Sequence, residues 1–271
     1  MASDAAAAPL APGVLTTIGS GLLSVDVAPA AGGRIAQIRH DGVELLIGHS
    51  ATNASMLAWG SYPMVPWAGR IRRGQFDFEG RRHRLPINLG PHAIHGVGFA
   101  MPWHLDTATS DAVELSLALP QDARWLFGGV ARQRIEVDAD RVRMRLSVTA
   151  GDRAMPVALG WHPWFRKPGR VEFAPTAWYP RDDEGIATQP VAAPPPGPWD
   201  DCFVNTAPVI LHCSGRRVRL TSDCRDWVVY DQPAHATCVE PQSGPPDAFN
   251  LAPLVLAPGE TLQRWFLMEW L

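Results

Sequence analysis

Two residues in the sequence have the chemistry and the surroundings of a proton-transfer pair. His162 lies in the aromatic run Gly160–Phe165, where an imidazole needs a partner and titrates near neutral pH, which suits a general acid. Glu240 follows an apolar run, where a carboxylate needs a partner or a function, and the stiff proline-rich segment after it could position a base. The alternatives are a structural histidine and a glutamate that forms an ion pair with an arginine.

An arginine and histidines gather on segments rich in Gly, Pro and Trp that do not resemble a packing stripe. Arg70 lies in Pro63–Ile71, and His95 lies in a following loop, three residues after His92. A guanidinium holds two oxygens in a fork geometry, which suits sugar hydroxyls or phosphate. Two histidines three residues apart are also compatible with a metal, but no further ligand motif accompanies them, so we expect no metal site. The alternative for both histidines is a structural role.

Other charged residues lie close to these candidates in the sequence. Arg72 and Arg73 could contact an anionic group or form a solvated basic turn. Asp200 and Asp201 form a carboxylate pair that could bind a ligand or only mark a turn. The sequence has no Gly-x-Ser-x-Gly elbow, no phosphate-binding Gly-rich loop and no dinucleotide fingerprint, which argues against a serine hydrolase and a nucleotide-dependent enzyme.

The elements that must position these residues read as strands. Polar and apolar residues alternate along Arg141–Val148 and Val113–Leu119, the pattern of half-buried strands. Turn signals such as Asp41-Gly42 and Glu79-Gly80 separate further short strands, and Ala257–Glu260 precedes a last strand, Thr261–Trp270. Such spacing predicts an all-β sandwich or barrel. Helical periodicity is scarce, and only Ser50–Ala58 or Gln121–Phe127 could hold a helical turn or two.

The composition favours a turn-rich globular chain, which we interpret as one domain over residues 1–271. Its 24 Gly and 26 Pro exceed the usual share of these residues, and the formal net charge of −3 gives no basic footprint for nucleic acid. The proline-rich segment 189–198 is interpreted as a surface loop. No secretory leader pattern and no run of about 20 apolar residues is present, so we expect a cytoplasmic protein without a membrane segment. The four cysteines form no C-x-x-C pair and are expected as free buried thiols.

Five segments together resemble the aldose 1-epimerase (galactose mutarotase) family in their order and rough spacing. The resemblance extends from about Gly32 to Thr261 and implies a large galactose-mutarotase-like β-sandwich (supersandwich) with few short helices. It also implies a cofactor-free and metal-free isomerase that interconverts the α and β anomers of a hexose or related aldose. The five segments are Pro63–Ile71, Asn88–Gly98, Gly160–Phe165, Asp200–Phe203 and Glu240–Asn250.

The resemblance assigns a role to each candidate residue. His162 would be the general acid and Glu240 the general base, while Arg70 and His95 would bind sugar oxygens. Asp200 matches a substrate-binding aspartate, with Asp201 as a near competitor. Trp164 is expected to stack on the apolar face of the sugar ring. The sequence departs from the family at Gly69, where many relatives have Asn, and at Val97, where a second Gly often follows His-Gly; both changes bear on the sugar preference.

Three alternatives stay open at the level of sequence. The basic segment from Arg70 to Arg73 would also suit a mutarotase for a phosphorylated or otherwise acidic sugar. A non-catalytic carbohydrate-binding module could use the same sandwich. A two-carboxylate glycosidase could use Glu240 and Asp200, although it would leave the histidines without a role. In each case the expected partner is a small-molecule sugar, with no nucleic acid and no membrane, and the chain is expected to be a monomer or weak dimer.

Overall fold

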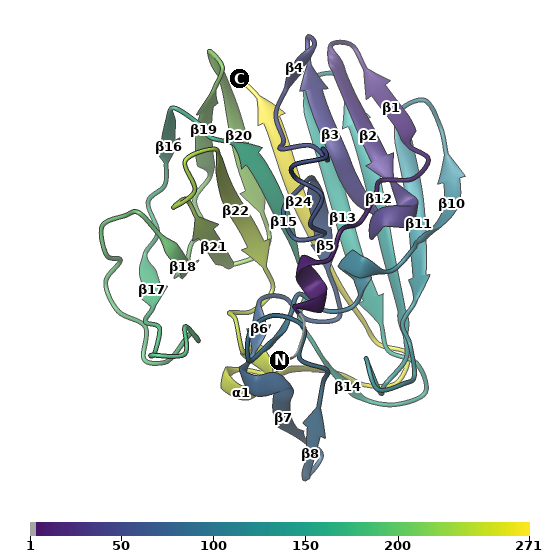
Figure 1. The fold of residues 1–271 in the computed structure, drawn as a ribbon, viewed down its shortest axis with the longest axis vertical. Coiled ribbons are helices and arrows are strands. Elements are labelled where there is room, and N and C mark those ends of the chain that lie inside the picture. The colour runs from purple at the N-terminus through teal and green to yellow at the C-terminus, as the bar shows by residue number, and fades with distance from the viewer. Residues whose placement is uncertain (1–3) are drawn as a thin grey trace.

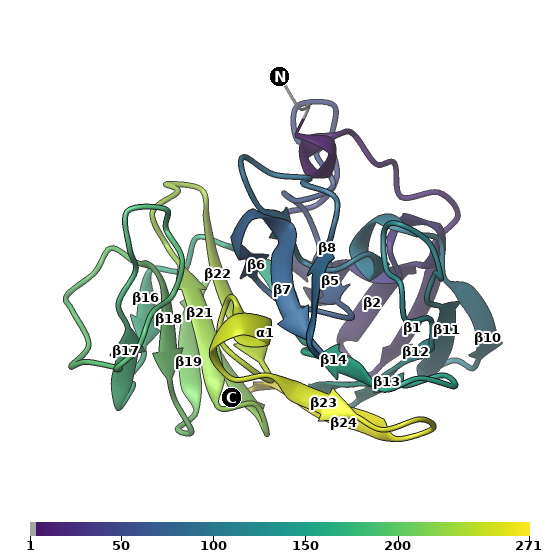
Figure 2. The same ribbon diagram turned by 90° about the horizontal axis from the view of Figure 1, so that it is seen from below.

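Strands with one apolar face pack into two large antiparallel sheets that lie face to face in the computed structural model, which describes residues 4–271. Figure 1 shows the larger sheet in front of the smaller one, and Figure 2 shows the two layers from below. Sequence alternation and structure agree along β13, where Val142, Met144, Leu146 and Val148 are buried and the residues between them are exposed or half-buried. The predicted all-β sandwich with few short helices is confirmed.

The larger sheet has ten strands. Its order across the sheet differs from the order along the chain, so strands far apart in sequence become neighbours. The order is β1 (Thr16–Ser20), β2 (Leu23–Ala28), β3 (Arg34–His40), β5 (Ser61–Met64), β15 (Gly160–Arg166), β22 (Ala236–Gln242), β21 (Asp226–Tyr230), β18 (Asp200–Val204) and β17 (Ala177–Tyr179), and β4 (Val43–Glu44) pairs with β3.

The smaller sheet has eight strands and forms the back layer of the sandwich. Its order is β10 (His104–Ala108), β11 (Ala112–Ala118), β12 (Val130–Asp138), β13 (Arg141–Thr149), β24 (Thr261–Trp270), β20 (Arg216–Ser222), β19 (Val209–Cys213) and β16 (Arg170–Glu172). The predicted last strand, Thr261–Trp270, has the bounds of β24, and a hairpin joins β12 to β13.

Three two-stranded ribbons and a few short helices complete the described chain. The ribbons pair β6 (Arg70–Ile71) with β9 (Ala93–Ile94), β7 (Gln75–Phe78) with β8 (Arg81–Arg84), and β14 (Met155–Val157) with β23 (Leu254–Leu256). The helices are α1 (Ala248–Leu251) and the 3₁₀ turns η1 (Ala5–Ala7), η2 (Pro29–Ala31), η3 (Arg72–Gly74) and η4 (Gly98–Ala100). None of the helices within residues 4–271 has the length and apolar character needed to cross a bilayer.

The helical turns predicted in two segments are wrong. Within residues 50–58 the Asn53 side chain donates to the carbonyl oxygens of Gly48 and Ala58, and this closes a loop in place of a helix. In residues 121–127 the backbones of Asp122 and Trp125 form an isolated bridge, and Oδ1 of Asp122 accepts from the Arg124 backbone N–H at 2.8 Å. Asn and Asp side chains compete with helical hydrogen bonds in this way. The segment 189–198 is mostly exposed and connects adjacent strands β17 and β18, which confirms a surface loop.

The core lies between the two sheets and is rich in aromatic residues. Trp161 and Phe165 on β15 are fully buried, and Trp161 packs on Phe266 of β24 with ring centroids 5.8 Å apart. Because side chains alternate along a strand, the residues between them, His162 and Trp164, point to the opposite face of the larger sheet. All four cysteines are free and buried, as the sequence predicts.

Asp226, at the start of β21, is a buried carboxyl group whose ionisation opposes folding. Tyr179 donates to its Oδ1 at 3.0 Å, but burial raises its pKa to about 6. A pKa raised in the folded state means that stability is lost as the pH rises through 6. We expect Asp226→Asn to remove this loss, so that its stabilisation relative to the parent is about 1 kcal/mol larger at pH 7.5 than at pH 5. Urea unfolding at both pH values measures the difference; a pH-independent effect would contradict it.

Candidate active site

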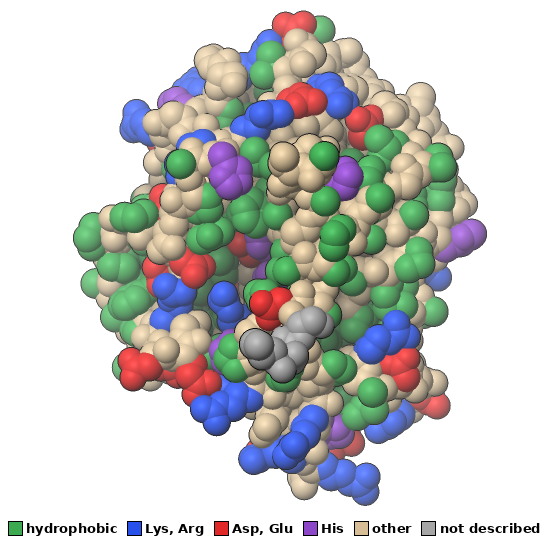
Figure 3. Space-filling view, viewed as in Figure 1, with side chains coloured by type: hydrophobic (Ala, Val, Ile, Leu, Met, Phe, Trp, Pro, Cys, Tyr) green, Lys and Arg blue, Asp and Glu red, His purple; other side chains and the backbone are tan. Residues whose placement is uncertain are grey.

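A cavity of about 350 Å³ opens on the face of the larger sheet that points away from the core. Figure 3 shows a hollow near the middle of this face, with acidic and histidine atoms visible inside it. The volume suits a small polar ligand. Six of the residues that the sequence singles out line the cavity: Arg70, His95, His162, Trp164, Asp200 and Glu240.

Strand register assembles the floor of the cavity from four strands. Across β21 and β22, Val228 lies opposite Glu240, and across β15 and β5, His162 lies opposite Tyr62. Trp164, two residues along β15 from His162, pairs with Cys238, two residues along β22 from Glu240. Since residues two apart share a face, His162 and Glu240 lie side by side on the cavity face of the sheet.

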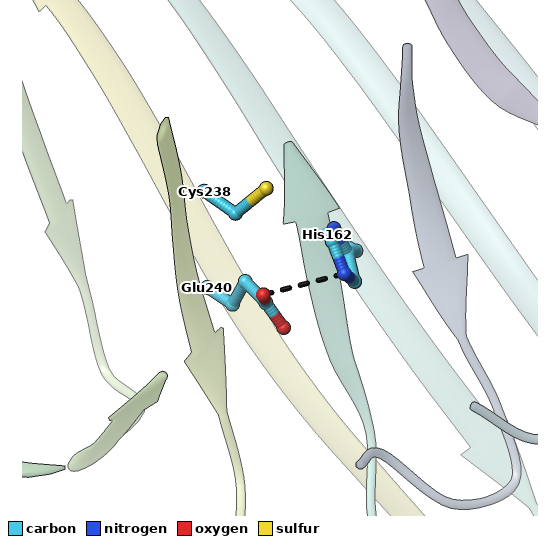
Figure 4. A group of neighbouring side chains, drawn as sticks. All are labelled: His162, Cys238 and Glu240. Atoms are coloured by element: carbon cyan, nitrogen blue, oxygen red, sulfur yellow. Dashed lines mark ion pairs between the residues drawn. The ribbon is translucent and has the colours of Figure 1, made fainter. Parts of the chain in front are cut away.

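His162 and Glu240 are in direct contact. Nε2 of His162 lies 3.3 Å from Oε1 of Glu240, and both residues are buried (Figure 4). Gln242, two residues after Glu240 on β22, donates from Nε2 to the other carboxylate oxygen at 3.2 Å. The carboxylate is therefore held from one side by an amide and faces an imidazole on the other. The structure pairs Glu240 with this histidine, and not with the arginine that the alternative interpretation required.

Burial opposes charge on both members of this pair. It lowers the pKa of His162 to about 3, and it raises the pKa of Glu240 well above the ordinary range of a carboxyl group. Both directions favour the uncharged forms. Moving one proton from the imidazolium to the carboxylate leaves the total number of protons on the pair unchanged, so in either form the singly protonated pair has one group that donates a proton and one atom that accepts a proton.

Aromatic rings fix the orientation of the His162 imidazole. Tyr62 and Trp164 stack on it with ring centroids 4.7 Å and 5.4 Å away, and His95 approaches edge-on at 5.0 Å. Behind Tyr62 lies the fully buried Arg34, whose guanidinium is 5.0 Å from the Tyr62 ring and donates to four backbone carbonyl oxygens. Rings held in this way cannot rotate freely, so the imidazole presents a defined edge to the cavity.

A loop wall built on the β6–β9 ribbon carries Arg70 and His95. Arg70 pairs with Ile94, and the His95 backbone N–H donates to the Gly69 carbonyl oxygen at 2.9 Å. This pairing brings both side chains to one side of the cavity, which the sequence left undecided. Burial, and then the charges of His162 and Arg70, hold the pKa of His95 well below its ordinary value. His95 is therefore a neutral imidazole that can both donate and accept a hydrogen bond.

Comparison with known proteins identifies the fold and the family. The family model described as aldose 1-epimerase matches residues 15–269. This chain belongs to the aldose 1-epimerase family. Among solved structures, an Escherichia coli K12 protein named as an aldose 1-epimerase superimposes with a TM-score of 0.84 at 20% sequence identity. The match covers 95% of this chain and 99% of the Escherichia coli chain. A galactose 1-epimerase from Lactobacillus acidophilus has a TM-score of 0.78 at 17% identity, covering 93% and 92%. Identities this low establish likeness of fold only.

The curated relatives are less informative about activity. The Escherichia coli K12 protein YphB, described as uncharacterized, is 32% identical over 160 residues, which cover 55% of this chain and 51% of YphB. YihR of the same organism, also described as uncharacterized, is 25% identical over 138 residues, covering 49% and 44%. The chain thus spans about half the length of the curated relatives it matches.

Asp200 and Asp201 of this epimerase-family chain occupy different environments, because consecutive residues on a strand point to opposite faces of the sheet. Asp200 lines the cavity, whereas Asp201 does not. Arg181 contacts both, with Nη1 at 2.8 Å from Asp200 and Nε at 3.2 Å from Asp201. Alternation along the strand thus leaves Asp200 as the one of the two that a ligand in the cavity can reach.

Arg72 and Arg73 are bound to acidic residues of their own chain. Arg72 forms an ion pair with Asp182, and Arg73 Nη2 lies 2.6 Å from a carboxylate oxygen of Glu184. His92 belongs to the same network, since its Nδ1 accepts from the Arg73 backbone N–H and its Nε2 contacts the Glu184 carbonyl oxygen. None of these three basic residues lines the cavity. They hold the loop around residue 183 against the β6 ribbon, and His92 has the structural role considered for it.

Sequence reasoning missed several residues of the cavity, and Tyr62 and Gln242 are the two in contact with the acid–base pair. Tyr62 lies opposite His162 but 100 positions earlier in the sequence, so no local pattern in the sequence could have revealed it. Gln242 could have been found, because it follows Glu240 by two residues on the same strand and therefore shares its face.

Proposed function

We propose that this chain is an aldose 1-epimerase that interconverts the α and β anomers of an uncharged hexose or related aldose, with His162 as general acid and Glu240 as general base. The observation that carries the proposal is the contact between imidazole and carboxylate on the floor of a cavity of sugar size. Membership of the aldose 1-epimerase family supports it independently. No cofactor is needed, because the reaction transfers protons, breaks and re-forms one carbon–oxygen bond and changes no net oxidation state.

The cavity walls supply what is needed to hold a sugar ring. Arg70 and His95 offer hydrogen bonds from one wall, and Asp200 offers a carboxylate from another. The Trp164 ring provides an apolar surface for the C–H face of the sugar. Holding the ring in one orientation removes much of the entropic cost of the reaction. Sugar hydroxyls would also supply hydrogen bonds to charged groups, which favours the imidazolium and carboxylate forms of the pair over the neutral forms.

Ring opening requires one proton to be removed and one to be delivered. Glu240 accepts the proton of the anomeric hydroxyl while His162 delivers a proton to the ring oxygen. The bond between the anomeric carbon and the ring oxygen breaks, and an open-chain aldehyde forms. Each group contributes about 10²–10⁴-fold to the rate. After this step the carboxylate has become a carboxylic acid and the imidazolium a neutral imidazole.

Ring closure reverses these roles on the other face of the aldehyde. The carbonyl rotates about its bond to the neighbouring carbon, His162 removes the proton from the attacking hydroxyl, and Glu240 protonates the carbonyl oxygen. Both groups return to their starting states, so the protein carries no net proton change through a cycle. The cost of charging the buried pair is also the same before and after each turnover.

Uncharged sugars are favoured over phosphorylated or acidic ones because most of the basic segment is neutralised. Arg72 and Arg73 face Asp182 and Glu184 and do not line the cavity. Arg70 is the remaining arginine of that segment on the cavity wall, and the carboxylate of Asp200 lines the same cavity. A glycosidase that used Glu240 and Asp200 would give His162 no role, although His162 is the group in contact with Glu240.

Polarimetry of freshly dissolved α-glucose, α-galactose and a panel of other aldoses tests the proposal. We expect the protein to accelerate the approach to anomeric equilibrium for at least one uncharged aldose, and glucose 6-phosphate to react no better than glucose. No acceleration across the panel would refute an epimerase, and sugar binding without turnover would instead identify a carbohydrate-binding module. A clear preference for glucose 6-phosphate would favour the acidic-sugar alternative.

A further inference from the structure

Three different metal-ligating side chains meet at the floor of the cavity. One ligand atom each from His162, Cys238 and Glu240 lie within 4.8 Å of one another, and all three residues are buried. Figure 4 shows the thiol, the imidazole and the carboxylate on neighbouring strands β22 and β15. Cys238 and Glu240 share a face of β22 because they are two residues apart, and Cys238 lies opposite Trp164, two residues from His162. Nothing in the acid–base reaction uses the thiol.

We propose that His162, Cys238 and Glu240 form a binding site for a zinc-class divalent cation, and that an ion bound there blocks epimerisation. The fourth position of the ion would face the cavity, which His162 and Glu240 line. The inhibitory part rests on the function proposed above, because the ion would occupy both lone pairs that the reaction needs. The binding part does not depend on that function.

The distances fit a tetrahedral ion with little movement. Bonds of about 2.0 Å from zinc to nitrogen and oxygen place those two atoms about 3.3 Å apart. His162 Nε2 and Glu240 Oε1 are 3.3 Å apart. A bond of about 2.3 Å to sulfur requires about 3.6 Å between the sulfur and each of the other ligand atoms. Because one ligand atom from each residue already lies within 4.8 Å of the other two, a movement of the thiol on the order of 1 Å brings it to bonding distance.

The ligand set and its charge select the class of ion. One sulfur, one imidazole nitrogen and one carboxylate oxygen favour Zn²⁺ or Co²⁺ over Mg²⁺ and Ca²⁺, which prefer oxygen ligands alone. A dication with a thiolate, a carboxylate and a neutral imidazole has no net charge, and a neutral assembly is the arrangement that a buried site tolerates best. The ion would take the place of the protons on the thiol and on the pair, so binding releases protons.

The hydrogen-bonding environment of the His162 imidazole indicates that the cation binds reversibly. A histidine that ligates a resident metal usually donates its other ring N–H to an oxygen. Nδ1 of His162 is buried without a hydrogen-bond partner among residues 4–271. The imidazole therefore lacks the anchoring typical of a permanently held ion, and we infer an inhibitory site that fills and empties with the free concentration of the cation.

Titration with Co²⁺ alone tests the binding directly. We expect the wild-type protein to develop a thiolate-to-cobalt absorption band that Zn²⁺ removes by displacement. Cys238→Ser should lose this band and bind Zn²⁺ at least about tenfold more weakly. Cys213→Ser, a change of another buried thiol on β19 in the other sheet, is the matched control and should keep both. Absence of the band in the wild-type protein, or a Cys238→Ser variant that binds Zn²⁺ as tightly as the control, would overturn the proposal.

Activity measurements test the inhibition separately. Micromolar Zn²⁺ should slow the wild-type epimerase, EDTA should restore it, and Cys238→Ser should stay active but resistant to Zn²⁺. Inhibition that is equal in wild type and Cys238→Ser would refute the assigned ligand set. If the protein accelerates no aldose, the proposed function fails, while the Co²⁺ spectra still decide whether the cation site exists.

Discussion

Glu240→Gln is expected to lower the turnover number of the epimerase by about 10²–10⁴-fold with little change in KM, because an amide oxygen cannot accept a proton in the ring-opening step. The change keeps the shape of the side chain. The Gln242 amide can still donate to the oxygen of the new residue, as it now does to Oε2 at 3.2 Å. Burial also raises the pKa of Glu240, which makes this carboxylate a stronger base than an exposed one. Polarimetry gives the rates, and circular dichroism verifies the fold.

A matched control separates this effect from a general loss of charge. Glu172→Gln makes the same chemical change on β16, the edge strand of the smaller sheet, whereas the cavity lies on the larger sheet. Glu172 contacts His212 at 2.7 Å. Its turnover should equal that of the parent protein. If a folded Glu240→Gln protein keeps more than a tenth of the parental turnover, Glu240 is not the base, and the assignment of the acid–base pair is wrong.

Gly96→Ala is expected to destabilise the protein by about 2–5 kcal/mol and to weaken sugar binding, since it combines backbone strain with overpacking. Gly96 has φ of 77°, and a β-carbon there would lie far inside van der Waals contact of the Val65 carbonyl oxygen. Relief of that clash would shift the preceding residue, His95, which also has a positive φ and lines the cavity. Urea unfolding measures the stability, and KM reports the shift of His95.

Gly80→Ala provides the comparison that isolates the clash. Gly80 has φ of 71°, but nothing lies within 4 Å of a β-carbon built on it. This variant should therefore show only the cost of the left-handed conformation, about 1–2 kcal/mol, with an unchanged KM. Equal destabilisation by the two variants would mean that the approach of Gly96 to the Val65 carbonyl does not constrain the loop that carries His95.

The local sequence patterns predicted the strands well and the helices badly. The alternation of polar and apolar residues along Arg141–Val148 has the period of two that a strand requires. The residues before Thr261–Trp270 favour the backbone conformation of a turn. Both signals depend only on residues that are neighbours in the sequence. The helical turns expected in Ser50–Ala58 and Gln121–Phe127 were wrong because side-chain hydrogen bonds and a bridge closed those loops. Propensity alone does not weigh such competing contacts.

The sequence by itself also determined which chemical groups are available: an imidazole, a carboxylate and an arginine on stiff, aromatic-rich segments. Tertiary structure decided which of them meet. The register of β15 against β22 brings His162 to Glu240 and adds Cys238. The orientation of β18 in the sheet turns Asp200, and not Asp201, toward the cavity. Contacts with Asp182 and Glu184 remove Arg72 and Arg73 from consideration as ligand contacts.

The physical reason for this division is the range of the interactions involved. Strand formation and side-chain alternation depend on residues within a few positions of one another, so they can be predicted from a short window of sequence. Register and strand order depend on how the whole apolar face of each sheet packs against the other, and a slip of one residue would turn every side chain of a strand to the opposite face. His162 and Glu240 are 78 positions apart in the sequence, and packing of the complete sandwich brings them within 3.3 Å.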